Sequence, residues 1–132
     1  MYSGEGSRPV VLLVENEPLV REAISGVLRR DGFETLSASS AGEATALAQS
    51  AAGRIDVLVT DVQLGDGDGI ELAGNLRRRM PEMAALVISG LRAFEERAVA
   101  QGYGFLTKPF PRAKLLECVR ILSGRARASV TA

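Results

Sequence analysis

Side chains that could carry out chemistry stand directly after four of the short apolar runs in this sequence. They comprise carboxylates, an amide, a hydroxyl and an amine: Glu15, Asn16, Glu17, Asp61, Ser89 and Lys108. Carboxylates gathered at one place repel one another and lose hydration, so they need a compensating cation. A lysine can supply that charge, and so can Mg²⁺, which prefers oxygen ligands. Together these groups would form an electrostatic cradle for a phosphoryl group in transfer, with Asp61 as the attacking carboxylate.

The apolar runs that would position these side chains are five in number and read as strands. They are Val10–Val14, Glu34–Ala38, Asp56–Thr60, Ala85–Ser89 and Gly104–Thr107. The first, third and fourth are continuous rather than alternating, which is typical of strands buried on both faces of a parallel sheet.

The intervals between the runs have helical spacing of apolar residues. Pro18 fits the first turn of a helix, and Gly32 fits the position just after its end. Pro81 ends a third helix, and a weak fourth pattern runs from Ala93 to Gln101. Strand and helix alternating five times predict a doubly wound α/β fold with right-handed crossovers. Ligands of such folds bind outside the carboxyl ends of the strands, where the polar side chains stand.

Composition excludes several classes of protein. The chain has 132 residues, which suits one domain, and its 16 basic and 16 acidic residues give no net charge. This balance argues against a dedicated nucleic-acid or membrane-surface binder. The chain has no histidine and only one cysteine, Cys118, which excludes histidine-dependent hydrolases, His-ligated metals and internal disulfides. No signal peptide or membrane span is expected, so we predict a cytoplasmic protein.

Four segments resemble the receiver domain of two-component response regulators. They are VLLVENEP (11–18), DVLVTDVQLGDGDGIEL (56–72), ALVISG (85–90) and GFLTKPF (104–110). The resemblance implies a flavodoxin-like sheet of five parallel strands in the order 2-1-3-4-5 with five helices. It also implies a domain at 9–124, with a flexible N-terminus at 1–8 and a flexible tail or linker at 125–132.

The resemblance further implies a role for each polar side chain. Asp61 would be the phosphoacceptor, receiving the group from a histidine kinase or a phosphotransfer protein. Lys108 would contact the phosphoryl oxygens, and a cis Lys108–Pro109 bond is expected. Ser89 would swing in to hydrogen-bond the phosphoryl group, and Phe105 would be the switch aromatic that follows it. The implied Mg²⁺ ligands are the side chains of Glu15, Asn16 and Asp61 and the backbone carbonyl of Gln63.

The metal site departs from the family at Asn16. The family has an acidic pair here, whereas this chain has Glu15 followed by an amide. This change removes about one unit of negative charge, so we predict weaker Mg²⁺ binding. Glu17 could partly compensate, or it could cap the helix that begins at Pro18.

Two further departures concern the loop after Asp61 and the fourth helix. Gly65 stands where the family has proline, and we interpret residues 65–69 as a flexible turn, with Asp68 as a helix N-cap. The interval from Ser89 to Lys108 is short for the family. We therefore predict a short or irregular fourth helix, which leaves the choice of partner and a homodimer open.

The leading hypothesis is a module that is phosphorylated on Asp61 and then changes its binding surface. It would assist its own phosphorylation and dephosphorylation without being an enzyme in the ordinary sense. The alternative, favoured by Asn16, is a degenerate receiver that acts by phosphorylation-independent protein contact. An aspartyl-phosphate hydrolase is disfavoured, because the first strand end lacks the required aspartates. Direct nucleic-acid contact is not expected, since Arg77–Arg79 fit a solvated helix C-terminus.

Overall fold

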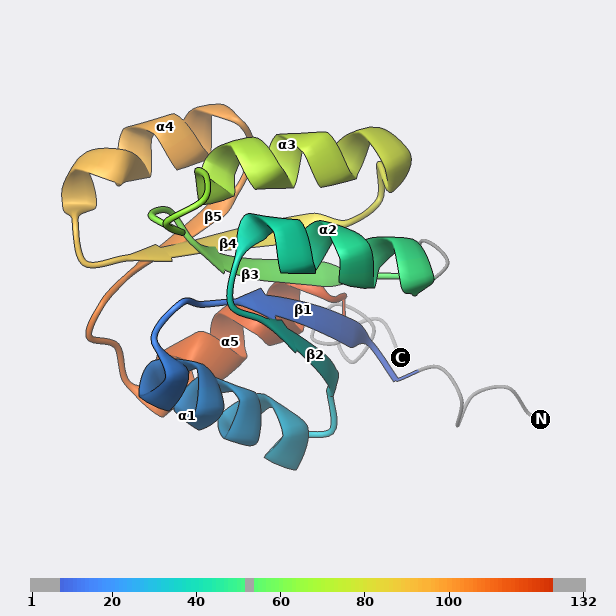
Figure 1. Cartoon of the computed structure of the whole chain (residues 1–132). Helices are drawn as coiled ribbons and strands as arrows, with labels where there is room; N and C mark the ends of the chain where they lie inside the picture. The colour runs from blue at the N-terminus through green and yellow to red at the C-terminus, as the bar shows by residue number, and fades with distance from the viewer. Residues whose placement is uncertain (1–7, 52–53, 125–132) are drawn as a thin grey trace.

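A five-stranded parallel sheet forms the centre of the molecule (Figure 1). The computed structural model describes residues 8–51 and 54–124, so the predictions for residues 1–7 and 125–132 lie outside the described residues. The strand order is β2-β1-β3-β4-β5, as the resemblance implied. The strands are β1 (Val10–Val14), β2 (Glu34–Ala38), β3 (Val57–Asp61), β4 (Ala84–Ser89) and β5 (Gly104–Thr107).

Helices cover both faces of the sheet, so the fold is doubly wound. They are α1 (Pro18–Arg30), α2 (Ala41–Ser50), α3 (Gly69–Arg79), η2 (Arg92–Phe94, one 3₁₀ turn), α4 (Glu95–Ala100) and α5 (Arg112–Leu122). Figure 1 shows α1 and α5 on one face and α2, α3 and α4 on the other. In the part of the chain that the structure describes, no helix is long and apolar enough to cross a membrane.

The sheet divides the core into two halves, and the interior strand β1, between β2 and β3, contributes to both. All five residues of β1 are buried. Leu12 and Val14 pack in the half covered by α2, α3 and α4. Val11 and Leu13 pack in the half covered by α1 and α5. Alternate side chains of one strand therefore enter opposite core halves, which is why the sequence of β1 is continuously apolar.

The predicted third strand is wrong by one residue at each end. Asp56 lies before β3, where its carboxylate accepts a hydrogen bond of 2.7 Å from the Val10 amide. Asp61 is the last residue of β3 and pairs in register with Ile88. The phosphoacceptor candidate is therefore fixed by the sheet rather than by a loop. The predicted irregularity of the fourth helix is confirmed, because η2 and α4 together span only Arg92–Ala100.

Local signals at the helix ends are mostly confirmed. Pro18 begins α1, and Gly32 adopts a φ of 95° just after that helix. Asp68 caps α3, since its carboxylate accepts hydrogen bonds from the first backbone amides of the helix. The capping role considered for Glu17 is wrong: Glu17 occupies the N-cap position of α1, but its side chain makes no capping bond. Cys118 is half-buried in α5 and packs against the core.

Gly69 fixes the start of α3 against the end of β3. A Cβ atom at this position would overlap the carbonyl oxygen of Asp61 and lie 2.7 Å from Thr60 Oγ1. Only glycine allows the backbones of the two elements to come this close. Gly69 therefore sets the distance between the phosphoacceptor candidate and α3.

We expect Gly69→Ala to destabilise the fold by about 1–3 kcal/mol, because the added methyl group must displace backbone. Denaturant unfolding monitored by circular dichroism measures this change. Gly74→Ala is the matched control in the same helix, since its Cβ would meet only Tyr103 Oη at 3.8 Å. The control should stabilise α3 by about 0.5–1 kcal/mol. Equal effects of the two substitutions would contradict the proposed close approach.

Candidate functional site

Glu15 is the most deeply buried acidic residue at the carboxyl edge of the sheet, with an exposed fraction of 0%. It follows β1, and its amide extends the pairing with β2 by donating to the Ala38 carbonyl at 3.0 Å. Its Oε1 accepts from Lys108 Nζ at 2.8 Å, and its Oε2 accepts from the Glu17 amide at 3.1 Å. The backbone carbonyl accepts from the Arg21 guanidinium at 2.8 Å. Four contacts therefore hold Glu15 in one position.

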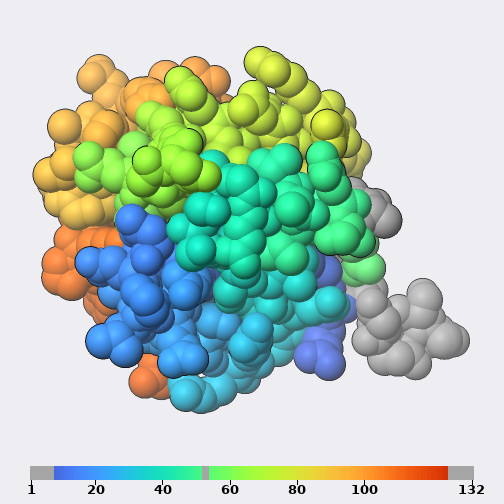
Figure 2. Space-filling model, viewed as in Figure 1, coloured from blue at the N-terminus to red at the C-terminus, as the bar shows by residue number. Residues whose placement is uncertain are grey.

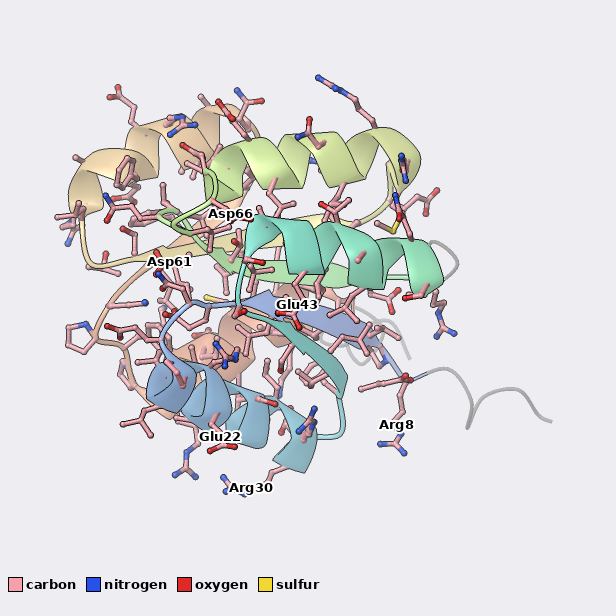
Figure 3. All side chains as sticks on the ribbon, viewed as in Figure 1. Arg8, Glu22, Arg30, Glu43, Asp61 and Asp66 are labelled. Carbon is pink, nitrogen blue, oxygen red and sulfur yellow. The ribbon has the colours of Figure 1, made fainter. Side chains whose placement is uncertain are left out.

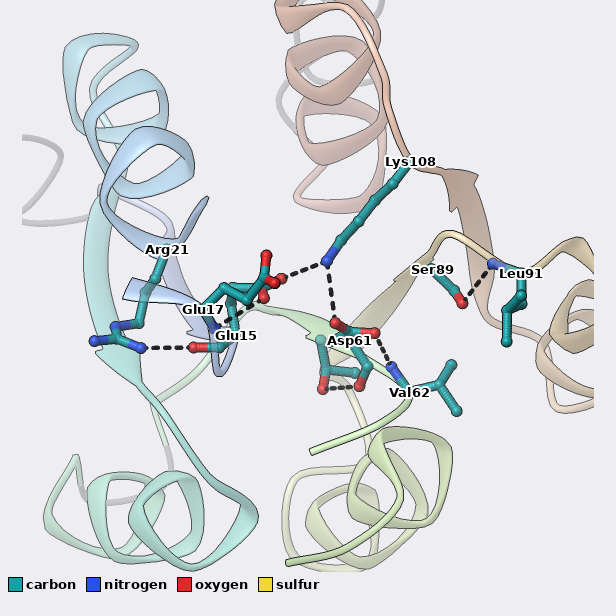
Figure 4. Close-up of polar contacts among 9 residues, drawn as sticks. Glu15, Glu17, Arg21, Asp61, Val62, Ser89, Leu91 and Lys108 are labelled. Atoms are coloured by element: carbon teal, nitrogen blue, oxygen red, sulfur yellow. Dashed lines mark hydrogen bonds and ion pairs between the residues drawn. The ribbon is translucent and has the colours of Figure 1, made fainter. Parts of the chain in front are cut away.

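Asp61 lies beside Glu15 at the end of the neighbouring strand β3 (Figure 4). Its Oδ2 accepts from Lys108 Nζ at 3.0 Å, and its Oδ1 accepts from the Val62 amide at 2.7 Å. The Thr60 hydroxyl donates to the Asp61 carbonyl at 2.8 Å. The Asp61 side chain is 15% exposed, so solvent reaches it while its orientation is fixed.

Lys108 contacts both carboxylates from the end of the edge strand β5. It follows β5, its amide donates to the Ser89 carbonyl at 2.8 Å, and its peptide bond to Pro109 is cis, as predicted. Burial lowers the pKa of Lys108, but the hydrogen bonds that its amine donates to Glu15 and Asp61 outweigh burial and leave the pKa above its ordinary value. The amine is therefore charged across the physiological pH range.

The remaining predicted residues surround this ion triad of Glu15, Asp61 and Lys108. Ser89 is buried at the end of β4, where its hydroxyl accepts from the Leu91 amide at 3.0 Å. Phe105 on β5 is half-buried against the core half under α2, α3 and α4. Asn16 and Gln63 are exposed in the loops that follow β1 and β3. The structure thus brings the strand-end residues to one edge, as predicted.

The oxygen atoms around the ion triad suit a hard cation, but the triad carries little net negative charge. Two carboxylates and one ammonium leave a net charge of about −1, and the nearby donors are oxygen atoms, which suit Mg²⁺. Within residues 8–51 and 54–124, no group of three or more Asp, Glu, His or Cys side chains could hold a metal ion. Position 16, which directly follows Glu15, is the neutral amide Asn16, so it adds no carboxylate to this pair.

The loop after Asp61 is more constrained than predicted. We call residues 62–68 the acidic loop. Gly65 has a φ of 78°, as a turn requires. However, the Asp66 carboxylate accepts from the Ala41 amide at 2.9 Å and the Gly42 amide at 3.0 Å (Figure 3). The predicted flexible turn is therefore tied to the first turn of α2.

Other contacts around the site had no signal in the sequence. The bond from Arg21 to the Glu15 carbonyl and an ion pair between Asp68 and Arg97 at 2.7 Å both support the strand-end loops. The partners of the second contact are far apart in sequence, and the local pattern that marks Asp68 as a helix cap gives no sign of Arg97. Arg21 could have been suspected only from its place in the first turns of the helix after Glu15.

The sequence model of the response regulator receiver domain matches residues 11–120. This match covers all five strands except Val10, the first residue of β1, and it covers most of α5. The chain therefore belongs to the response regulator receiver domain family, a class of phosphorylation-switched signalling modules of two-component systems. It is a signalling module of that class rather than a conventional enzyme.

Similar proteins include both regulators and a kinase. Over 128 residues the chain is 32% identical to the probable transcriptional regulatory protein TcrX of Mycobacterium tuberculosis, which covers 95% of this chain and 54% of TcrX. Over 113 residues it is 34% identical to the sensor kinase CckA of Brucella abortus, covering 83% of this chain and 12% of CckA. The chain therefore spans only about half, or less, of these relatives.

A solved structure has the same fold. The response regulator TrrA of Thermotoga maritima, in complex with Mg²⁺ and BeF, matches with a TM-score of 0.75 and 23% identity. The match covers 86% of this chain and 98% of TrrA. At this identity the likeness shows the shared arrangement of sheet and helices.

Removal of the Lys108 amine should leave the buried Glu15 carboxylate without its cation. We expect Lys108→Met to lower the free energy of unfolding by about 2–3 kcal/mol, less than for a fully buried pair, because the lysine is 23% exposed. Chemical denaturation at pH 7 measures the loss. Adding Glu15→Gln should recover part of it, since the amide carries no charge. Additive losses in the double variant would contradict the ion triad.

The contact between Asp66 and α2 should make stability depend on pH. Hydrogen bonds from the Ala41 and Gly42 amides hold the pKa of Asp66 below its ordinary value of 3.8. The contribution of Asp66 is therefore present above pH 3.8 and is lost as pH falls through the lower folded-state pKa. The difference in Tm between wild type and Asp66→Asn should be constant at neutral pH and should shrink in acid. A difference that stays constant through this acid range would contradict the account.

Proposed function

We propose that Asp61 accepts a phosphoryl group from a histidine kinase or a phosphotransfer protein in the cytoplasm. The observation that carries this proposal is the position of Lys108 Nζ, 3.0 Å from Asp61 Oδ2 and 2.8 Å from Glu15 Oε1. A fixed cation beside an accessible carboxylate is the arrangement that phosphoryl transfer needs. The membership of the family supports the same assignment.

In the transfer, a carboxylate oxygen of Asp61 forms a bond to phosphorus as the bond between phosphorus and the donor imidazole nitrogen breaks. The donor nitrogen leaves with the electron pair of that bond. Before the transfer, Lys108 balances the charge of the Asp61 carboxylate. After it, Lys108 balances the negative charge of the bound phosphoryl group. When bound, Mg²⁺ would neutralise phosphoryl oxygens, and the residues that would hold it are Glu15, Asn16, Asp61 and the Gln63 carbonyl.

The conformational response would begin at Ser89. Its hydroxyl oxygen now accepts from the Leu91 amide, and we propose that it leaves this contact when the side chain turns to donate to a phosphoryl oxygen. The release would free the segment that leads into η2 and α4, and Phe105 would move inward beside it. We propose that the surface of η2, α4 and β5 is the one that changes, and that the same module assists removal of the phosphoryl group.

The chain spans 54% of TcrX and 12% of CckA, so the activities of those whole proteins are not transferred to it. We propose a protein target for the changed surface and no direct contact with nucleic acid. A homodimer formed on that surface is one form this target could take.

The proposal is tested by incubating the protein with acetyl phosphate and Mg²⁺ and recording its intact mass. We expect an increase by one phosphoryl group that is absent without Mg²⁺ and absent in Asp61→Asn. Asp66→Asn, which removes a nearby carboxylate outside the triad, is the matched control and should still be modified. An adduct that persists in Asp61→Asn would sink the proposal, and no adduct on wild type would favour the degenerate receiver.

The substitution Asn16→Asp separates weak metal binding from no metal binding. We expect it to strengthen Mg²⁺ binding by about tenfold or more, because it adds one charge close to two other oxygen donors. Isothermal titration calorimetry of both forms measures the change. An Asn16→Asp form that still binds no Mg²⁺ at millimolar concentration would count against the metal site.

A further inference from the structure

The acidic loop is held from both sides by helices on the same face of the sheet. Asp66 accepts hydrogen bonds from the first turn of α2 on one side. Asp68 forms an ion pair with Arg97 of α4 on the other side, at 2.7 Å. In Figure 2 the green atoms of this part of the chain fill the space between the teal α2 and the yellow-orange α4. The loop therefore spans the distance between the two helices.

The carboxylate oxygen of Asp68 that does not contact Arg97 is bonded to α3 and fixes the side chain. Its Oδ1 accepts from the amides of Ile70 at 2.7 Å and Glu71 at 3.1 Å, which leaves Oδ2 for Arg97. Burial raises the pKa of Asp68, but the bonds from Arg97, Glu71 and Ile70 outweigh burial, so the pKa lies below its ordinary value. Because the carboxylate is anchored to α3, movement of Arg97 acts on a rigid group rather than on a free side chain.

The loop connects this ion pair to the phosphoacceptor through bonded neighbours. Asp68 forms an isolated antiparallel bridge with Gln63, the residue whose carbonyl is the proposed metal ligand. The Gly69 amide donates to the Val62 carbonyl at 2.7 Å, and the Val62 amide donates to Asp61 Oδ1 at 2.7 Å. Each step from Arg97 to Asp61 is thus a bond or a direct pairing.

We propose that Arg97 is a positioning residue for the phosphorylation site: through Asp68 it sets the place of the Gln63 carbonyl and couples the site to α4. The inference rests on the proposed function of Asp61. Coupling between two sites is reciprocal, so a loop that α4 holds in place for the metal must also bias α4 when the metal binds. This route is separate from that of Ser89, because it leaves β3 rather than β4.

A merely structural ion pair on the surface would behave differently. Such pairs contribute little to stability, and Arg92, which pairs with Glu95 at 3.7 Å one turn earlier, is an example on the same segment. Substitution of Arg92 should leave the site unchanged. Substitution of Arg97 should weaken Mg²⁺ binding, because it releases the loop that carries the ligand.

The experiment compares wild type, Arg97→Gln, Arg97→Lys and Arg92→Gln by NMR spectroscopy during titration with Mg²⁺ and beryllofluoride. In wild type we expect amide shifts both at residues 61–63 and in α4. In Arg97→Gln the shifts at 61–63 should persist, those in α4 should fall by at least half, and Mg²⁺ affinity should fall about two- to fivefold. Arg97→Lys should recover part of both effects, and Arg92→Gln should match wild type.

Asp68→Asn provides a second test, because asparagine also caps helices well while it removes the charge. It should reproduce the Arg97→Gln result, and the double variant should add little to either single change. Equal Mg²⁺ affinity and equal α4 shifts in wild type and Arg97→Gln would overturn the inference alone. Absence of any shift at residues 61–63 in wild type would overturn the proposed function and the inference together.

Discussion

The ion triad of Glu15, Asp61 and Lys108 is the interaction on which the rest of the site depends. Glu15 has no exposed surface, and a buried carboxylate without a partner costs several kcal/mol. Its cation comes from the residue after β5, whereas the carboxylates follow β1 and end β3. Because the contact forms only when β1, β3 and β5 are assembled in one sheet, folding itself places the amine beside Asp61, the proposed phosphoacceptor.

The same contact gives the site its chemical character. Lys108 holds two neighbouring carboxylates close together, and their formal negative charge exceeds that of the one amine, which is what a divalent cation or a phosphoryl group would meet. A change of charge at this site could reach the rest of the molecule through Ser89 or through the acidic loop. These two features follow different strands. Ser89 leads from β4 to η2, and the acidic loop leads from β3 to α3 and, through Arg97, to α4. Two routes therefore converge on the short fourth helical segment.

Most of the fold could be predicted because its signals are local. Continuous apolar strands, Pro18 at a helix start and Pro81 after a helix end each act within a few residues. The strand ends then placed Glu15, Asp61 and Lys108 at one edge by the geometry of parallel sheets alone. The one-residue error at β3 arose because Asp56 directly precedes the apolar residues of the strand. In the structure it lies outside the strand, and its carboxylate accepts from the Val10 amide.

Contacts between residues distant in the sequence could not be predicted in this way. Asp66 binds α2 across 25 positions, and an exposed glycine-rich segment gives no sign of that partner. The ion pair of Asp68 with Arg97 likewise has no signal in the sequence, although the cap that Asp68 provides was predicted from local spacing. The predicted side-chain cap at Glu17 is wrong for a different reason. Glu17 does occupy the N-cap position of α1, but its carboxylate makes no capping bond there.

Mapping of the modified residue tests the central claim most directly. After treatment with acetyl phosphate and Mg²⁺, borohydride reduces an aspartyl phosphate to homoserine, and peptide mass spectrometry locates the product. We expect homoserine at Asp61 and at no other carboxylate. Homoserine at Asp66 or Asp68, reduction of the Glu17 carboxyl to its own longer-chain alcohol, or modification that leaves Asp61 intact would contradict it.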